Sequence, residues 1–400
     1  MNFSERENTH IDRLSVLLSI ICQDLRLGIN YSEPDSYVAK VDIVNVNGCL
    51  ITSGAGKGIN SQLGALAEAL EHYTLTAERE HSVALCADDI VRQPALQHDG
   101  LVQSLRALED NSPVIECIEF EPLDHQGETL KVPAVLVSYP HMQHAINDLN
   151  HRQAPLAKYF TNSGVALGVG LDESILHGIN EVIERDYLSD IYQHLSLGTL
   201  PPLINVSEQW LRHNVNSYSE LSDELQGVDI YYGDWKGLPF GLCVSHGESL
   251  MALIGSGCSV SVHVALERAI TEWWQISRLK SIQDLEADAT VSHMLTTLNL
   301  KSLIKLNSLK LLEKSALAPT DRQSLTPIRE QVIYVVGKLN ERGLSVFFRQ
   351  IECYRTLVNI TQIYIPGLDR FHLIRAGSLV VPNNVLLEHI SRESKDTGHV

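Results

Sequence analysis

The spacing of hydrophobic residues predicts helices and strands mixed along the whole chain. Apolar residues recur at helical spacing in five long segments, which are residues 9–27, 60–79, 172–195, 261–280 and 329–342. Alternating apolar and β-branched residues predict strands over 37–52, 114–121, 130–139, 227–233, 239–246, 344–352 and 356–365. Shorter helices are expected between 281 and 318. This mixture indicates an α/β or α+β fold rather than an all-α or all-β one.

The same pattern contains no break that would divide the chain into independent domains. There is no short-period repeat, no low-complexity tract and no linker rich in Pro, Gly or Ser. A glycine-rich turn is expected over 54–58, and Asp172 is expected as the N-cap of the helix that follows it. We therefore expect a helical extension over 1–36, one large domain over 37–385 and a C-terminal tail over 386–400.

Two of the predicted helices carry acidic residues among small and apolar neighbours. Glu68 and Glu71 lie three residues apart, so their carboxylates share one face of the first helix. Glu181, Glu184 and Arg185 repeat this arrangement on the second helix. A glycine lies one turn before each acidic set, and we expect Gly64 and Gly178 to leave room for a ligand there.

A third helix shows a related stripe, in which Arg268, Glu272 and Gln275 follow one another at helical spacing. A single acidic pair on an amphipathic helix is most often solvated. The same pattern on three helices favours an arrangement in which the three faces converge. Five carboxylates would then face two arginines, a cluster that is stable only when metal ions or protons neutralise it. Such oxygen-rich sites suit Mg²⁺ that bridges a polyphosphate, so the pattern predicts a metal–nucleotide site built on helices.

The charge of the chain narrows the classes of partner. Its 31 Lys and Arg residues against 49 Asp and Glu residues give a formal net charge of −18. Nucleic-acid backbones and anionic lipids attract basic surfaces, so we expect neither a nucleic-acid partner nor a membrane partner. Seven scattered cysteines without a C-x-x-C motif argue against a disulfide framework and a zinc knuckle. Without a signal peptide or a long apolar run, the chain is expected to be soluble and cytoplasmic.

Gly56 and Lys57 do not complete a phosphate-binding P-loop. Ile51 stands where that motif needs its first glycine, and Gly58 stands where it needs Ser or Thr. Two interpretations stay open: a glycine turn that presents Lys57 to phosphate, or an ordinary turn with a solvated lysine. His72 and His177 lie on the acidic helices, and for both a structural role is favoured over a catalytic one.

Taken in order, several motifs resemble the YcaO family. They are G-K-G at 56–58, A-L-A-E-A-L-E-H at 65–72, S-G-V-A-L-G at 163–168, N-E-V-I-E-R-D at 180–186, A-L-E-R-A-I-T-E-W-W-Q at 265–275 and Y-I-P-G-L-D at 364–369. The resemblance covers about residues 40–380. It implies an ATP-binding fold without a Walker motif, with long helices that carry the acidic motifs. It also implies that the oxygen of a peptide amide attacks the γ-phosphate of ATP, after which a nucleophile displaces the phosphate.

The resemblance also implies roles for individual residues. The implied Mg²⁺ ligands are Glu68, Glu71, Glu181, Glu184 and Glu272. Lys57, Arg185, Arg268 and Gln275 would complete the ATP site with these acids, and Glu71, Arg185 and Gln275 are the catalytic candidates. The chain departs from the family pattern at His72, where arginine is frequent, and at Ser163, where asparagine is usual. It has no proline after Pro382, whereas ring-forming members typically end in a proline-rich tail.

The leading functional hypothesis is an ATP-dependent cyclodehydratase that closes Cys, Ser or Thr of a ribosomally made precursor peptide to thiazoline or oxazoline. A thioamide- or amidine-forming enzyme of the same family is the first alternative, and a non-catalytic ATP-binding accessory or scaffold protein is the second. The resemblance implies a separate leader-peptide-binding partner related to ubiquitin-activating enzymes. A flavin dehydrogenase in the same complex and a homodimer both stay open.

Overall fold

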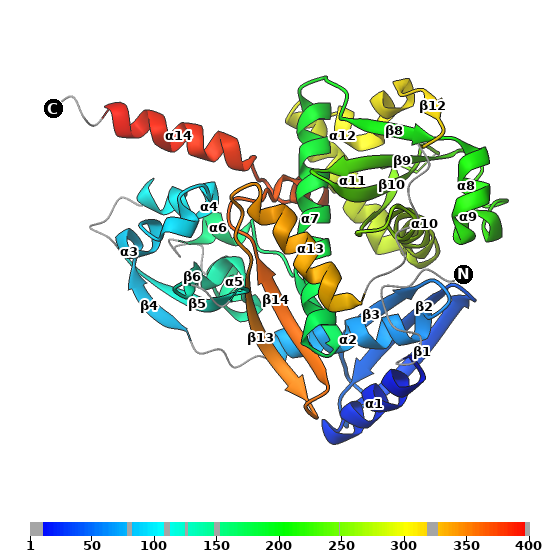
Figure 1. Cartoon of the computed structure of the whole chain (residues 1–400), viewed down its shortest axis with the longest axis horizontal. Coiled ribbons are helices and arrows are strands. Elements are labelled where there is room, and N and C mark those ends of the chain that lie inside the picture. Colours follow the sequence, from blue (N-terminus) through cyan, green and yellow to red (C-terminus); the bar gives the residue numbers. More distant parts are fainter. Residues whose placement is uncertain are drawn as a thin grey trace.

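The computed structural model describes residues 11–77, 82–107, 113–124, 127–147, 153–247, 249–317 and 327–396 (Figure 1). Within these residues the strands form three sheets. The first is an antiparallel meander of β1 (Gly28–Asp35), β2 (Val38–Val44) and β3 (Leu50–Lys57). The helices α1 (Ile11–Asp24) and α2 (Ser61–Ala77) accompany it, and Leu18, Leu66 and Leu70 are buried in their shared core.

The second sheet has the strand order β4-β5-β13-β14-β7, with β6 paired to β5. Its antiparallel strands are β4 (Val83–Cys86), β5 (Val114–Pro122), β6 (Leu130–Pro133), β7 (Val165–Val169), β13 (Phe347–Tyr354) and β14 (Val358–Tyr364). The short helices of this region are α3 (Ala87–Val91), α4 (Gly100–Gln103), α5 (Tyr139–Asn147) and α6 (Ala154–Ala157).

The third sheet has the order β11-β10-β9-β8-β12. Its strands are β8 (Leu203–Val206), β9 (Val228–Trp235), β10 (Leu238–Ser245), β11 (Leu253–Cys258) and β12 (Lys314–Ser315). Five helices accompany it: α8 (Glu208–Asn214), α9 (Asn216–Glu220), α10 (Val262–Leu279), α11 (Ile282–Thr297) and α12 (Ser302–Lys305). The helix α10 packs along β10 and β11.

The long helix α7 (Leu171–Ser196) runs through the middle of the molecule (Figure 1). It packs on β7 and β14 of the second sheet and also touches β11 of the third. The helix α13 (Ile328–Asn340) lies against α7, and α14 (Asn383–Asp396) packs on α4. Among the described residues, no helix is long and apolar enough to cross a membrane.

Glycines let two helices lie directly on neighbouring strands. A Cβ atom on Gly56 of β3 would overlap the backbone of Ser61, and one on Gly54 would overlap the backbone of Ala65 and Ala69. In the same way, a Cβ atom on Gly255 of β11 would overlap the backbone of α10. These contacts fix the distance between the strand that carries Lys57 and the helix that carries Glu68.

The prediction of a mixed fold is confirmed, but several local predictions are wrong. Residues 54–57 belong to β3 rather than to a turn, because their glycines permit the close packing on α2. The single strand expected over 37–52 is two strands with a hairpin between them. The strand expected over 130–139 ends at Pro133, and α5 begins at Tyr139.

Two further differences concern helix ends. The helix α7 begins at Leu171, with Gly170 as its N-cap, so Asp172 lies inside the first turn and is not the cap. The segment expected as a tail contains most of α14. The strands β1, β4, β7, β8, β11 and β12 were not expected from the pattern. Residues 9–10, with which the first predicted helix begins, lie outside the described residues.

Candidate functional site

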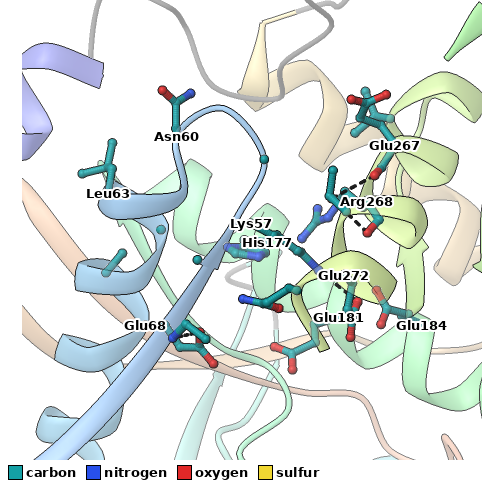
Figure 2. A pocket seen from close by; sticks show the side chains of 18 of the residues that line it. Lys57, Asn60, Leu63, Glu68, His177, Glu181, Glu184, Glu267, Arg268 and Glu272 are labelled. Carbon is teal, nitrogen blue, oxygen red and sulfur yellow. Dashed lines mark hydrogen bonds and ion pairs between the residues drawn. The ribbon is translucent and has the colours of Figure 1, made fainter. Parts of the chain in front are cut away.

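A cavity of about 720 Å³ lies where α2, α7 and α10 come together. All nine residues that the sequence places in a metal–nucleotide site line it, namely Lys57, Glu68, Glu71, Glu181, Glu184, Arg185, Arg268, Glu272 and Gln275. Figure 2 shows Glu181 and Glu184 near Glu272, with Glu68 on the opposite helix. The expected convergence of the three acidic helix faces is therefore present.

The acids of α2 are held by backbone N–H groups of neighbouring strands. The amide of Ala55 in β3 donates a hydrogen bond to Glu68 Oε2 at 2.8 Å, and the amide of Leu167 in β7 donates to Glu71 Oε1 at 2.6 Å. Burial raises the pKa of Glu68. Charge-assisted bonds of this kind fix each carboxylate while leaving part of its acceptor capacity for a further ligand.

The acids of α7 surround a guanidinium group. Arg185 lies 3.4 Å from Glu184 Oε1 and 3.9 Å from Glu181 Oε1. Ser256 Oγ in β11 donates to Glu184 Oε1 at 2.6 Å. Burial lowers the pKa of Arg185, but Glu184, Glu272 and Glu181 outweigh it and raise that pKa above its ordinary value. Arg185 therefore keeps its positive charge inside the cavity.

The third helix is linked to β3 by an ion pair. Lys57 Nζ lies 2.9 Å from Glu272 Oε2, and both side chains are largely buried. Burial opposes ionisation of Glu272, but the charges of Lys57 and Arg185 outweigh it and lower the pKa of Glu272. Lys57 therefore points into the cavity, as one of the two open interpretations of the glycine-rich segment requires.

The cavity carries an excess of negative charge. Among its described lining residues are eight glutamates, against three Lys or Arg side chains. Burial raises the pKa of Glu181 to about 7, with Glu184 adding to the effect and Arg185 opposing it. A carboxylate that tends to take up a proton in this way is one whose charge a bound cation would compensate.

The donor set fits Mg²⁺, which prefers oxygen ligands. Within the described residues, no group of three or more His, Cys, Asp or Glu side chains is arranged to hold a metal ion on its own. Mg²⁺ is usually bound by one or two carboxylates together with waters and substrate phosphates. The residues therefore suit a metal ion that arrives with a polyphosphate.

Two expectations about neighbouring residues need revision. Gly178 faces Gly164 and Ile363 rather than the cavity, so it permits helix packing and does not leave room for a ligand. Gly64 does line the cavity, beside Gly56 of β3. His72 lines it as well, and its Nδ1 lies 2.9 Å from the carbonyl oxygen of Ser53. This contact is in keeping with a structural role.

Several lining residues were not singled out from the sequence. Glu173 is buried and accepts a hydrogen bond from the amide of Val169, and it precedes His177 and Glu181 at four-residue spacing on α7. That spacing was a usable signal. Asn214, Asn216 and Glu220 come from α8 and α9, where no periodic pattern marked them.

The chain is similar to known proteins in sequence pattern and in fold. A sequence model described as YcaO cyclodehydratase, ATP- and Mg²⁺-binding, matches residues 55–369. No curated protein sequence shows significant similarity to the chain. Among solved structures, YcaO from Methanopyrus kandleri bound with AMPPCP and Mg²⁺ has a TM-score of 0.60 at 18% identity, covering 93% of this chain and 94% of that one.

Two other structures share the fold. A heterocyclase in complex with substrate and cofactor has a TM-score of 0.61 at 19% identity and covers 96% of this chain, which spans 57% of the length of that protein. A chain of the E. coli microcin synthetase McbBCD complex has a TM-score of 0.56 at 15% identity, covering 86% of this chain and 88% of that one. The family match extends over most of the chain and carries ATP and Mg²⁺ as its cofactors, as expected. The chain belongs to the YcaO family.

Proposed function

We propose that the protein is an ATP-dependent peptide cyclodehydratase that activates a backbone amide by phosphorylating its oxygen. The observation that carries this proposal is the convergence of the acids of α2, α7 and α10 on one cavity, with Lys57, Arg185 and Arg268 among them. Phosphoryl transfer depends mainly on positioning and on neutralising charge, and these side chains provide groups for both.

In the proposed reaction, the amide oxygen of the peptide forms a bond to the γ-phosphorus as the bond to the β,γ-bridging oxygen breaks, and ADP leaves. A Cys, Ser or Thr side chain of the peptide then attacks the amide carbon and loses its proton. The carbon–oxygen bond breaks and inorganic phosphate leaves, the amide nitrogen releases its proton, and a thiazoline or oxazoline results. The peptide thus loses one water for each ATP consumed.

The lining residues are assigned roles in this reaction. Glu68, Glu71, Glu181, Glu184 and Glu272 would hold Mg²⁺, which supplies neutralisation of phosphate charge when bound. Lys57 and Arg268 would bind phosphate oxygens. Arg185 keeps its charge between two glutamates and would contact the transferred phosphoryl group. Gln275 would donate its amide N–H to a phosphate or to the peptide amide.

We further propose that a separate protein brings the precursor peptide to this cavity. The E. coli microcin synthetase neighbour is solved as the McbBCD complex, also with pro-MccB17 bound. The proposal needs a leader-binding protein as an additional component, and it leaves a flavin dehydrogenase as an optional one. Cytoplasmic reaction conditions, with reduced thiols and Mg-ATP, are the expected setting.

The test combines the protein with Mg-ATP and a candidate precursor peptide, with and without the partner. Phosphate release and the intact mass of the peptide are measured together. We expect one phosphate released for each water lost from the peptide, and neither product with Glu184→Gln. Exchange of oxygen for sulfur would indicate the thioamide alternative. ATP binding without peptide-dependent turnover, with every partner tried, would contradict the proposed enzymatic activity and favour a non-catalytic accessory role.

A further inference from the structure

The cavity has two ends with different chemistry. At the first end, the carboxylates of α2 and α7 lie beside Lys57 and Arg185, and apolar side chains continue the lining along α2, β7 and α7. These apolar residues are Leu63, Ala67, Val165 and Leu176. This end therefore offers groups for a metal ion and its phosphates, and an apolar surface for the base of a nucleotide.

The second end is formed by α8, α9 and the first turns of α10. Its lining residues are Asn214, Asn216, Glu220, His263, Val264 and Glu267, so side-chain amides and carboxylates dominate it. Among the described lining residues, the basic side chain closest in sequence to this end is Arg268, which directly follows Glu267 on α10. The two glutamates there do not have Lys57 and Arg185 beside them as the carboxylates of the first end do, and little apolar surface is offered to a base, so this end suits a nucleotide less well than the first.

The walls of the second end are held in place. Both carboxylate oxygens of Glu267 accept from the amide of Ser217 at 3.2 Å, which ties α10 to the start of α9. His263 Nδ1 lies 2.9 Å from the carbonyl oxygen of Asn214, and its ring stacks on Trp210 with centroids 5.7 Å apart and planes 16° apart. The binding surface at this end therefore needs little reordering to receive a ligand.

Two side chains of α9 stand at the mouth of this end. Asn216 and Glu220 lie four residues apart on the helix, so they share one face, and both are exposed while lining the cavity. An asparagine amide can donate to and accept from a peptide backbone. A carboxylate at the mouth attracts a basic side chain and repels an acidic one.

We propose that the end of the cavity formed by Asn214, Asn216, Glu220 and Glu267 binds the peptide segment that carries the amide to be activated, and that it selects segments with a neutral or basic residue beside that amide. This inference rests on the proposed function. In this arrangement ATP binds at the first end of the cavity and the peptide binds at the second. The phosphoryl acceptor then reaches the triphosphate along α10, past Arg268.

The test uses two short probe peptides of the form Gly-X-Cys-Gly, in which X is Lys in one probe and Glu in the other, so that the charged residue directly precedes the cysteine and carries the carbonyl of the amide to be activated. Binding of the fluorescently labelled probes is measured by anisotropy, and the KM for ATP and for each peptide is measured by phosphate release. The variants are Asn216→Ala and Glu220→Gln. Glu208→Gln is the matched control, because Glu208 lies on the adjacent α8, pairs with Lys314 at 3.7 Å and does not line this cavity.

We expect wild type and the control to bind the Lys probe more tightly than the Glu probe. Glu220→Gln should reduce that preference by roughly fivefold, the scale of one exposed charge pair, and Asn216→Ala should weaken both probes. The KM for ATP should stay unchanged. A rise in the KM for ATP instead would assign this end to the nucleoside, and equal binding of both probes by wild type and Glu220→Gln would contradict the selection.

The binding measurement also separates this inference from the proposed function. If the probes bind with the expected preference but no peptide-dependent phosphate release occurs, the peptide site stands and the catalytic proposal fails. If phosphate release occurs but the α9 variants leave peptide binding and peptide KM unchanged, the reaction stands and the peptide site lies elsewhere.

Discussion

At the scale of single residues, the ion pair between Lys57 and Glu272 is the contact that joins β3 to α10 across the cavity. Its 2.9 Å separation and low exposure make it more than a surface pair. The lysine compensates a buried carboxylate and stands where it would meet a phosphate. The sequence indicated that Lys57 follows glycines before an acidic helix, but its pairing with a residue 215 positions away needed the fold.

Replacement of Lys57 by Met should therefore lower ATP affinity by about tenfold, the scale of one charged hydrogen bond. It should also raise the pKa of Glu272, because the positive charge that lowers it is removed. ATP affinity is measured by calorimetry in the presence of Mg²⁺. Lys40→Met is the matched control, because Lys40 lies on the neighbouring β2 and pairs with Asp42 at 3.0 Å outside the cavity. Equal losses in both variants would show that Lys57 has no specific role.

His372 makes a second prediction at this scale, on stability. It lies behind α7, where its backbone amide donates to Ser189 Oγ at 2.9 Å. Desolvation, with Arg185 and Arg370 nearby, lowers its pKa well below the ordinary value. The unfolded chain takes up a proton there near pH 6.5 and the folded chain does not, so acidification through that pH destabilises the fold. The stability that the neutral His372 side chain provides is therefore lost on acidification and restored as the pH rises.

Below about pH 6.5, we expect His372 to lower the free energy of unfolding by at most about 1.4 kcal/mol for each pH unit of acidification. Urea unfolding of wild type and His372→Asn is compared between about pH 5 and pH 7. Wild type should lose stability more steeply toward pH 5, so the two free energies of unfolding should converge or cross. Parallel curves would mean that the pKa of this histidine is the same in the folded and the unfolded chain, which would contradict the prediction.

At the scale of elements, the packing of β3 on α2 and of β11 on α10 depends on glycine. The hydrophobic pattern located the long helices well because their period is strong, but it placed a turn at 54–58 and did not reveal β11. Glycine is normally disfavoured in strands, so a propensity argument assigns such segments to turns. Here Gly54, Gly56 and Gly255 are strand residues because a helix backbone lies where a Cβ atom would be.

Gly56→Ala should therefore separate β3 from α2 and displace both Lys57 and the Ala55 amide that holds Glu68. We expect a loss of stability of about 1–3 kcal/mol, typical of overpacking, with weaker ATP binding. Gly337→Ala is the control, since nothing lies within 4 Å of the added Cβ atom in the middle of α13. Helix propensity predicts a gain of up to about 1 kcal/mol there. Thermal unfolding of both variants checks the opposite signs, and a neutral Gly56→Ala would refute the packing argument.

At the scale of the whole molecule, the cavity is assembled from segments that lie far apart in the chain. Its lining comes from residues 55–72, 162–185, 214–220 and 263–275. The sequence pointed to the three acidic helices, since Glu pairs among small and apolar residues would be unusual on three separate surfaces. It gave no sign of the contribution from α8 and α9, because Asn214 and Asn216 carry no pattern that differs from an ordinary loop.

The acidic residues behind the net charge of −18 do not all lie on the outer surface of the protein. Eight of the 49 acidic residues line one cavity with three Lys or Arg side chains among its described residues. Their mutual repulsion is a cost in the absence of a cation. The central claim is the proposal that five of them, Glu68, Glu71, Glu181, Glu184 and Glu272, bind ATP through Mg²⁺, and this excess of negative charge and the membership of the YcaO family support it.

Calorimetric titration of ATP into the protein, with Mg²⁺ and with EDTA, tests that claim most directly. Wild type and the exposed-surface control Glu330→Gln should bind ATP with Mg²⁺, and EDTA should abolish most of the affinity. The double variant Glu71→Gln, Glu184→Gln should lose at least about tenfold in affinity with Mg²⁺ and show little further change with EDTA. Binding that is equally tight in wild type and double variant, or unaffected by EDTA, would contradict the account.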